Sequence, residues 1–323
     1  MRLVLLLLAS VVFAHAQATE PLQLQQTIPL ADVKGRIDHL SIDVKNQRLF
    51  VAALGNDTVE VVDLKAGKRA HTISGLAEPQ GVLYLASVDR LYVANARDGT
   101  LRIYDGSSFA SLKVIQLGDD ADNVRYDPGE DLVYVGYGSG TLGAFHTDGT
   151  KVRDIKLDSH PESFQLERSG ARVFVNLPKS RTIAVVDRKT GTLVSTWQTD
   201  GALSNYPMAL DEADKRLFVV FREPAQLDVL NTGTGKIIAK LPSVGDSDDV
   251  FFDAKRRRVY AIGGQGKLSV YEQGNSDNYK ELANIATVPG ARTGFFSPDL
   301  DRLFVAVRQQ GSESAAIRVY RPE

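Results

Sequence analysis

The stretch Arg48-Leu49-Phe50-Val51-Ala52 recurs along the chain at a nearly constant spacing. Its next copy is Arg90-Leu91-Tyr92-Val93-Ala94, and further copies follow as far as the C-terminal region. The central aromatic residue falls at positions 50, 92, 134, 174, 218, 260 and 304, which gives spacings of 42, 42, 40, 44, 42 and 44 residues. A period of about 20–50 residues is typical of repeat proteins, in which each repeat is one supersecondary unit. The sequence therefore predicts seven such units.

Each unit has the pattern of several short β-strands. The repeated stretch is rich in β-branched and aromatic residues and has no helical period, which favours a buried strand. In the first unit, Leu40-Ser41-Ile42 predicts a strand before that stretch, Val59 and Val61 predict one after it, and Ile73 lies on a fourth. Four short antiparallel strands in about 40–45 residues are typical of a β-propeller blade.

The two ends of the chain complement each other. The last unit stops at Glu323 after its third strand, and an additional strand, Leu22 to Leu30, precedes the first unit. An incomplete blade would leave an unpaired strand edge at the seam of the ring. We therefore predict an all-β, seven-bladed β-propeller in which the N-terminal strand completes the last blade. It forms a single domain over residues 17–323.

The first residues have the pattern of an export signal. Arg2 is followed by the apolar run Leu3 to Phe13, and Ala14-His15-Ala16 fits the small-x-small rule for cleavage. The apolar run is shorter than the roughly 20 residues that a membrane-spanning helix needs. We predict a signal peptide at residues 1–16, a periplasmic or secreted protein, and no membrane span in the remaining chain.

Composition limits the chemistry that this chain can perform. Of its 323 residues 43% are hydrophobic, and 38 Lys and Arg against 40 Asp and Glu leave a net charge of −2. This slight negative charge disfavours nucleic acid as a partner. The absence of cysteine (Cys 0) excludes disulfides, thiolate metal sites and covalently attached c-type haem. Carboxylates, imidazoles, amides and hydroxyls must supply any chemistry, and we expect a monomer.

The repeated stretch, with the residues that follow it, resembles a known family. The copy from Arg48 to Asp63 is the clearest, and the one from Arg90 to Asp105 is next. Both are similar to the YVTN-repeat (YncE-like) family of exported seven-bladed β-propellers. The resemblance covers essentially the whole chain after residue 16, and it implies export and the propeller fold. It brings no catalytic motif, and Phe145-His146 and Tyr271-Glu272 depart from its Val-Asp ending.

The repeat also predicts a ring of polar residues. In a propeller the first strand of each blade lines the central channel, and the loop before it opens on one face. Counting back 12 positions from each repeated aromatic gives Asp38, Gln80, Asp122, Glu162, Tyr206, Asp248 and Arg292. His39 follows Asp38, and an extended strand would point these neighbours to opposite faces. We take these eight residues as candidates for ligand binding.

Carboxylates that converge on a channel repel one another. They must bind a cation, pair with an arginine such as Arg292, or hold a proton at a raised pKa. Asp38, Asp122, Glu162 and Asp248 are therefore candidate ligands of a divalent cation, Ca²⁺ or Mg²⁺. His39 or His160 would shift the preference toward zinc or another transition metal. The alternative is a solvated ring with a structural role, in which loop carboxylates accept hydrogen bonds from neighbouring turns.

Three functions remain open from the sequence. The first is an exported propeller that binds a protein partner or a small polar ligand at the channel mouth, without catalysis. The second is a metal-assisted lactonase, other hydrolase or lyase that uses the carboxylate ring. The third is a redox protein that depends on a quinone or on the cofactor of a partner. No complete catalytic motif occurs in the sequence, so catalytic residues are not assigned and the enzymatic status stays open.

Overall fold

The structure is a computed structural model that describes residues 20–275 and 277–323. The predicted signal peptide, residues 1–16, lies outside the described residues and stays a prediction. Within the described ranges, no helix reaches the length and apolar character that a membrane crossing requires.

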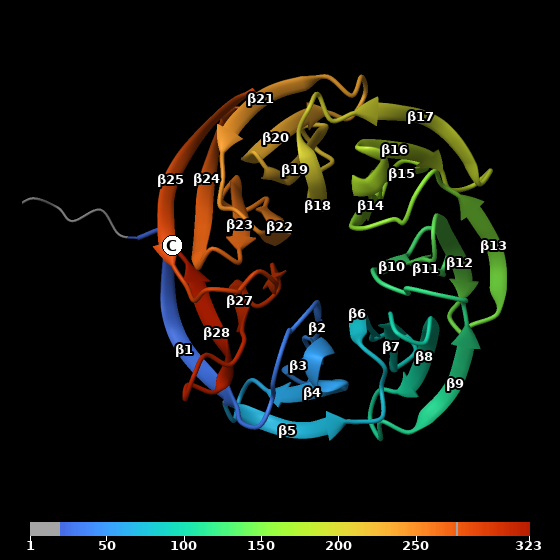
Figure 1. Ribbon diagram of the computed structural model, residues 1–323, viewed down its shortest axis with the longest axis vertical. Coiled ribbons are helices and arrows are strands. Elements are labelled where there is room, and N and C mark those ends of the chain that lie inside the picture. Colours follow the sequence, from blue (N-terminus) through green and yellow to red (C-terminus); the bar gives the residue numbers. More distant parts are fainter. Residues whose placement is uncertain (1–19, 276) are drawn as a thin grey trace, which may run out of the picture.

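Seven four-stranded antiparallel sheets stand around a central axis (Figure 1). The first three blades contain, from the axis outward, β2 (Leu40–Asp43), β3 (Arg48–Ala53), β4 (Thr58–Asp63) and β5 (Lys68–Ile73); β6 (Pro79–Leu85), β7 (Arg90–Asn95), β8 (Thr100–Asp105) and β9 (Ser111–Gln116); β10 (Val124–Asp127), β11 (Leu132–Tyr137), β12 (Thr141–His146) and β13 (Lys151–Lys156).

The next three blades contain, in the same order, β14 (Phe164–Leu166), β15 (Arg172–Leu177), β16 (Thr182–Asp187) and β17 (Thr192–Gln198); β18 (Leu203–Asp211), β19 (Arg216–Glu223), β20 (Ala225–Asn231) and β21 (Ile237–Pro242); β22 (Ser247–Asp253), β23 (Arg258–Gly263), β24 (Lys267–Asn275) and β25 (Asn278–Ala286). The seventh contains β26 (Gly294–Ser297), β27 (Arg302–Val307), β28 (Ala315–Pro322) and β1 (Leu22–Leu30). Two 3₁₀ turns, η1 (Leu54–Asn56) and η2 (Pro178–Ser180), connect strands in blades 1 and 4. The predicted seven-bladed, all-β fold is confirmed.

The repeated stretch forms the second strand of each blade and supplies much of the core. All seven repeated aromatic side chains are at most 1% exposed. Phe50 of blade 1, for example, packs with Leu91 and Val93 of blade 2, and its ring lies 5.3 Å from that of Tyr84. Burying such side chains is the main stabilising contribution to a fold. The repeated stretch therefore recurs once per blade because each blade needs apolar side chains that pack against the next one.

The N-terminal strand closes the ring as predicted. β1 is antiparallel to β28, with Leu22 opposite Pro322 and Leu30 opposite Ala315. Figure 1 shows the blue β1 on the outer edge of the red last blade. Ile28 and Leu30 are fully buried in a cluster that also contains Val51 of blade 1. The first and last parts of the chain thus share one blade and the core beside it.

Asp228 of β20 is a buried carboxylate that lowers stability at neutral pH. It is 0% exposed, and Gln226 donates one hydrogen bond of 2.8 Å to its Oδ1. Burial raises the pKa of Asp228 to about 6. Because the folded state holds this proton more tightly than the unfolded state, stability falls as the pH rises from about 4 to about 6 and stays lower above that.

We expect Asp228→Asn to increase the free energy of unfolding by about 2 kcal/mol at pH 8, after allowance for solvent screening. At pH 4 the same substitution changes it little, because the carboxyl is already protonated there. Urea denaturation of both proteins at the two pH values measures the difference. An equal effect at both pH values would show that ionisation of Asp228 does not limit stability.

Candidate functional site

The backbone places the predicted ring residues at one level around the axis. Six of them lie just before or at the start of the innermost strands, and Tyr206 lies within β18. The amides of three of them extend the pairing with the second strand. Asp38 donates to the carbonyl of Ala52 at 2.7 Å, and Asp122 donates to that of Gly136 at 2.9 Å. Glu162 donates equivalently to the Asn176 carbonyl, at 3.0 Å. Each acceptor lies two residues after the repeated aromatic, so one register sets the position of these side chains.

The side chains of the ring converge on a cavity of about 190 Å³. All eight residues proposed from the sequence line it. Four others lie beside them: Arg36, Asp120, His160 and Arg222. The structure thus brings the whole predicted set together at the channel mouth. Ligand binding there stays a prediction.

The expected separation of Asp38 and His39 is wrong. Both side chains face the cavity, and His39 Nε2 lies 3.7 Å from Asp38 Oδ1. The physical reason is that both residues precede β2, which begins at Leu40, so the alternation of a strand does not apply to them. Asp38 also accepts a hydrogen bond of 3.0 Å from Arg36.

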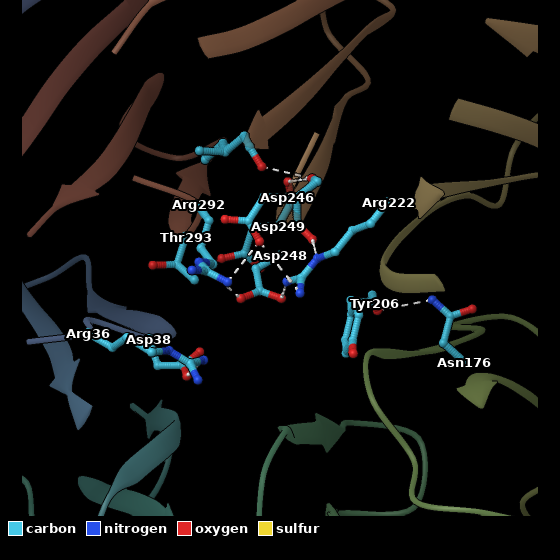
Figure 2. Close-up of polar contacts among 12 residues, drawn as sticks. Arg36, Asp38, Asn176, Tyr206, Arg222, Asp246, Asp248, Asp249, Arg292 and Thr293 are labelled. Carbon is cyan, nitrogen blue, oxygen red and sulfur yellow. Dashed lines mark hydrogen bonds and ion pairs between the residues drawn. The ribbon is translucent and has the colours of Figure 1, made fainter. Parts of the chain in front are cut away.

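Two arginines neutralise the carboxylates on the side of blades 5 to 7. Figure 2 shows Asp248 between Arg222 and Arg292. Arg222 donates to Asp248 at 2.6 Å, and Arg292 donates to Asp246 at 2.9 Å. The Arg222 guanidinium also lies 4.0 Å from the centre of the Tyr206 ring, a cation–π contact. This half of the mouth is an ion-pair cluster that an aromatic face supports.

Two histidines flank Asp122 on the other side. Asp122 Oδ1 lies 3.9 Å from His39 Nε2, and its Oδ2 lies 4.0 Å from His160 Nε2. In each imidazole Nδ1 faces an acceptor: His39 Nδ1 is 3.4 Å from Asp249, and His160 Nδ1 is 2.6 Å from the Gly138 carbonyl. Both rings therefore direct Nε2 toward Asp122, and His39 Nε2 faces Asp38 as well.

Burial and charge set the protonation of these groups. Burial opposes the charged form of both histidines, but a nearby carboxylate outweighs it in each case. Asp249 raises the pKa of His39 to about 10. Asp122 raises the pKa of His160 to about 9. Burial raises the pKa of Asp248 to about 7 and that of Glu162 well above its usual value, and neighbouring carboxylates add to both shifts. Burial also opposes ionisation of Asp122, but the adjacent imidazoles hold its pKa below the usual range.

The four carboxylates predicted as metal ligands do not form one ligand set. Asp38 is paired with Arg36 and Asp248 with Arg222. Within the described part of the chain, Asp122, His160 and Glu162 are the group whose ligand atoms come within 4.8 Å of one another. An imidazole thus takes the place of two of the predicted carboxylates.

Arg36, Asp120 and Arg222 line the mouth although they are not among the eight residues predicted from the sequence. Arg36, Asp120 and His160 lie 14 positions before a repeated aromatic, two before a ring residue, so the same count would have found them. Asp120 has a left-handed backbone, with φ of 40°. Several other residues 14 positions before a repeated aromatic also have a positive φ, so a turn precedes the ring residue in those blades. Arg222 lies four residues after Phe218, near the turn between the second and third strands, and these turns are expected on the same face as the ring.

Below His39 the channel continues as a second cavity of about 390 Å³. Its walls come from the innermost strands and include Val82, Val124 and Phe251, with Arg168 at the opposite opening. The channel thus has one polar mouth and a more apolar interior, which makes the two openings chemically different.

Comparison with solved structures identifies the fold. The crystal structure of the RRP9 WD40 repeats superposes with a TM-score of 0.80 over 94% of this chain and 100% of that one, at 11% sequence identity. The chain has a WD40-type β-propeller fold. A chain of the mitotic checkpoint complex superposes with a TM-score of 0.78 at 14% identity, over 98% of both chains. One of Kuenenia stuttgartiensis hydrazine synthase gives 0.72 at 17% identity, over 88% of this chain and 96% of that one.

Sequence comparison adds a partial match. A WD repeat-containing protein of Dictyostelium discoideum, AAC3, is 27% identical over 123 residues, which cover 38% of this chain and 26% of that protein. No protein-family model matches the chain. Membership of the YVTN-repeat family therefore stays a prediction. These similarities show the fold of the chain and assign no activity or ligand to it.

Proposed function

We propose that the protein is an exported β-propeller that binds a small polar ligand, or a polar side chain of a protein partner, at its channel mouth. The observation that carries this proposal is the cavity of about 190 Å³ in which all seven repeats place a side chain with a polar group. Function in such folds depends on sites built from loops, because the scaffold itself is shared by many activities.

The size and the lining of the cavity define the ligand. A volume of about 190 Å³ holds about six water molecules at roughly 30 Å³ each, which matches a small molecule or one side chain. Arg222, Tyr206 and Gln80 offer donors and an aromatic face, while Asp122 and Glu162 offer acceptors. A ligand with both donor and acceptor groups matches this lining best.

Protein partners fit the same proposal. WD40-type propellers commonly bind proteins, and one of the similar structures is a chain of a checkpoint complex. The predicted signal peptide at residues 1–16 supports an interaction outside the cytoplasm. Mass spectrometry of the protein recovered from the periplasm or the medium tests this location, and a chain that retains Met1 in the cytoplasm would contradict it.

A metal-assisted hydrolase, such as a lactonase, is the alternative function. It is favoured by one specific observation, the grouping of Asp122, His160 and Glu162 at the mouth. A bound divalent cation would polarise a carbonyl or activate water there. Metal-dependent hydrolysis of simple lactones, lost on Glu162→Gln, would support this alternative over binding alone.

Thermal melting with a panel of small carboxylic acids, amino acids, sugars and lactones tests binding at the mouth. A ligand at about 100 times its dissociation constant stabilises the folded chain by about 2.7 kcal/mol. We expect at least one compound to raise the melting temperature, and Arg222→Gln to abolish the increase. Arg168→Gln at the opposite opening is the matched control and keeps it. No response, or a response that Arg222→Gln leaves intact, would contradict the proposal.

A further inference from the structure

Blades 3 and 4 bring three potential metal ligands to one side of the mouth. Asp122, His160 and Glu162 each offer one ligand atom, and these atoms all lie within 4.8 Å of one another. The three residues precede the innermost strands β10 and β14, which fix their backbone. Two carboxylate oxygens and one imidazole nitrogen form a donor set that suits zinc and similar ions.

His160 is held in the orientation that a metal ligand requires. Its Nδ1 lies 2.6 Å from the carbonyl oxygen of Gly138, and a carbonyl only accepts, so Nδ1 carries a hydrogen. Nε2 is therefore the ring atom that faces Asp122. A hydrogen bond from the other ring nitrogen to a carbonyl or carboxylate orients most histidine ligands in metal sites.

Asp122 provides an independent observation. Its side chain lines the cavity, it is 5% exposed, and its Oδ1 is buried without a hydrogen bond from any described residue. A buried carboxylate oxygen without a hydrogen-bond donor is unfavourable, and the nearest imidazole nitrogen, His39 Nε2, lies 3.9 Å away, beyond hydrogen-bond distance. Asp122 Oδ2 is 4.0 Å from His160 Nε2, too far for a hydrogen bond. That gap is close to the roughly 3.4 Å between two ligands of a tetrahedral ion with bonds of about 2.1 Å.

We propose that Asp122, His160 and Glu162 bind one divalent transition-metal ion, for which zinc is the best match. The imidazole nitrogen disfavours calcium and magnesium, which prefer oxygen ligands. Three protein ligands leave a coordination position open toward the cavity, as in catalytic zinc sites. This inference rests on the proposed function, because it names the ligand class of the same mouth: small molecules whose carboxylate or carbonyl oxygen completes the coordination.

Titration of the purified, metal-free chain with zinc alone tests the inference. We expect one zinc ion per chain by calorimetry and by metal analysis after dialysis. His160→Gln and Glu162→Gln are each expected to weaken binding by about 100-fold or more, since they remove a direct ligand. His71→Gln on the outer strand β5 and His146→Gln, exposed on β12, are matched controls that change the affinity less than about threefold.

Cobalt provides a second readout that does not depend on stability. A tetrahedral cobalt complex has strong visible absorption, which the unsubstituted chain and both controls should show and the two ligand variants should lose. Absence of zinc uptake, or equal zinc affinity and cobalt absorption after both ligand substitutions, would overturn the inference. The thermal-shift test with Arg222→Gln uses other probes and another residue. A failure of zinc binding can therefore be distinguished from a failure of polar-ligand binding.

Discussion

A chain that begins at Asp32, and so lacks β1, is expected not to fold to a stable ring. β1 supplies the outer strand of blade 7, and Leu22, Ile28 and Leu30 on it are at most 1% exposed. Burial of three such side chains contributes about 6 kcal/mol at roughly 2 kcal/mol each, comparable to the total stability of many domains of about 5–15 kcal/mol. The deletion also exposes the edge of β28 to pairing with other chains.

Circular dichroism and size-exclusion chromatography measure this outcome. The matched control begins at Gln17, lacks only the predicted signal peptide, and is expected to melt cooperatively as a folded protein. The chain that begins at Asp32 should be aggregated or should lose the cooperative transition. If both chains melt within a few degrees of each other, β1 does not close the ring.

Arg188→Met is expected to be strongly destabilising because it breaks an ion pair in the core. Arg188 Nε lies 2.5 Å from Asp127 Oδ2, and the two side chains are 3% and 1% exposed. Asp127 ends β10 of blade 3 and Arg188 follows β16 of blade 4, so the pair joins adjacent blades. Arg188 also donates to the Glu167 carbonyl at 2.8 Å. Removing one partner of a buried pair costs about 3–5 kcal/mol, since it leaves an uncompensated charge.

Denaturant unfolding of three variants checks this expectation. The exposed Arg168→Met is the control and should change stability by less than about 0.5 kcal/mol. The double variant Asp127→Asn, Arg188→Met should recover part of the loss, because the unpaired carboxylate is gone. A loss below about 1 kcal/mol for Arg188→Met alone would contradict a stabilising role for the pair.

The fold could be predicted from the sequence because its determinants are periodic. The aromatic residues from Phe50 to Phe304 recur where the second strand of each blade must be buried, and the predicted closing strand coincides with β1. The same period placed Asp38, Asp122 and Asp248 at the mouth, since the first strand pairs with the second in the same register in these blades. The sequence period was therefore enough to predict the positions of strands and ring residues, which recur in each blade.

The pairing of side chains could not be predicted in the same way. The choice of Asp248 as partner of Arg222 depends on side-chain conformations, which differ between blades with the same backbone. Asp38 and His39 were expected to diverge as neighbours in an extended strand do, but both precede β2, which begins at Leu40. His160 contributes through a contact with the Gly138 carbonyl, and no sequence pattern contains that contact.

The histidine side chains allow the most direct test of binding at the channel mouth. Of the five histidines, His15 lies in the predicted signal, His39 and His160 line the mouth, and His71 and His146 lie on the strands β5 and β12. NMR spectra of the protein labelled with ¹⁵N-histidine are recorded while a compound that raises the melting temperature is added. The proposed function predicts that the signals of His39 and His160 shift and saturate while those of His71 and His146 stay in place. Shifts confined to His71 and His146, or saturation without any change at His39 and His160, would contradict it.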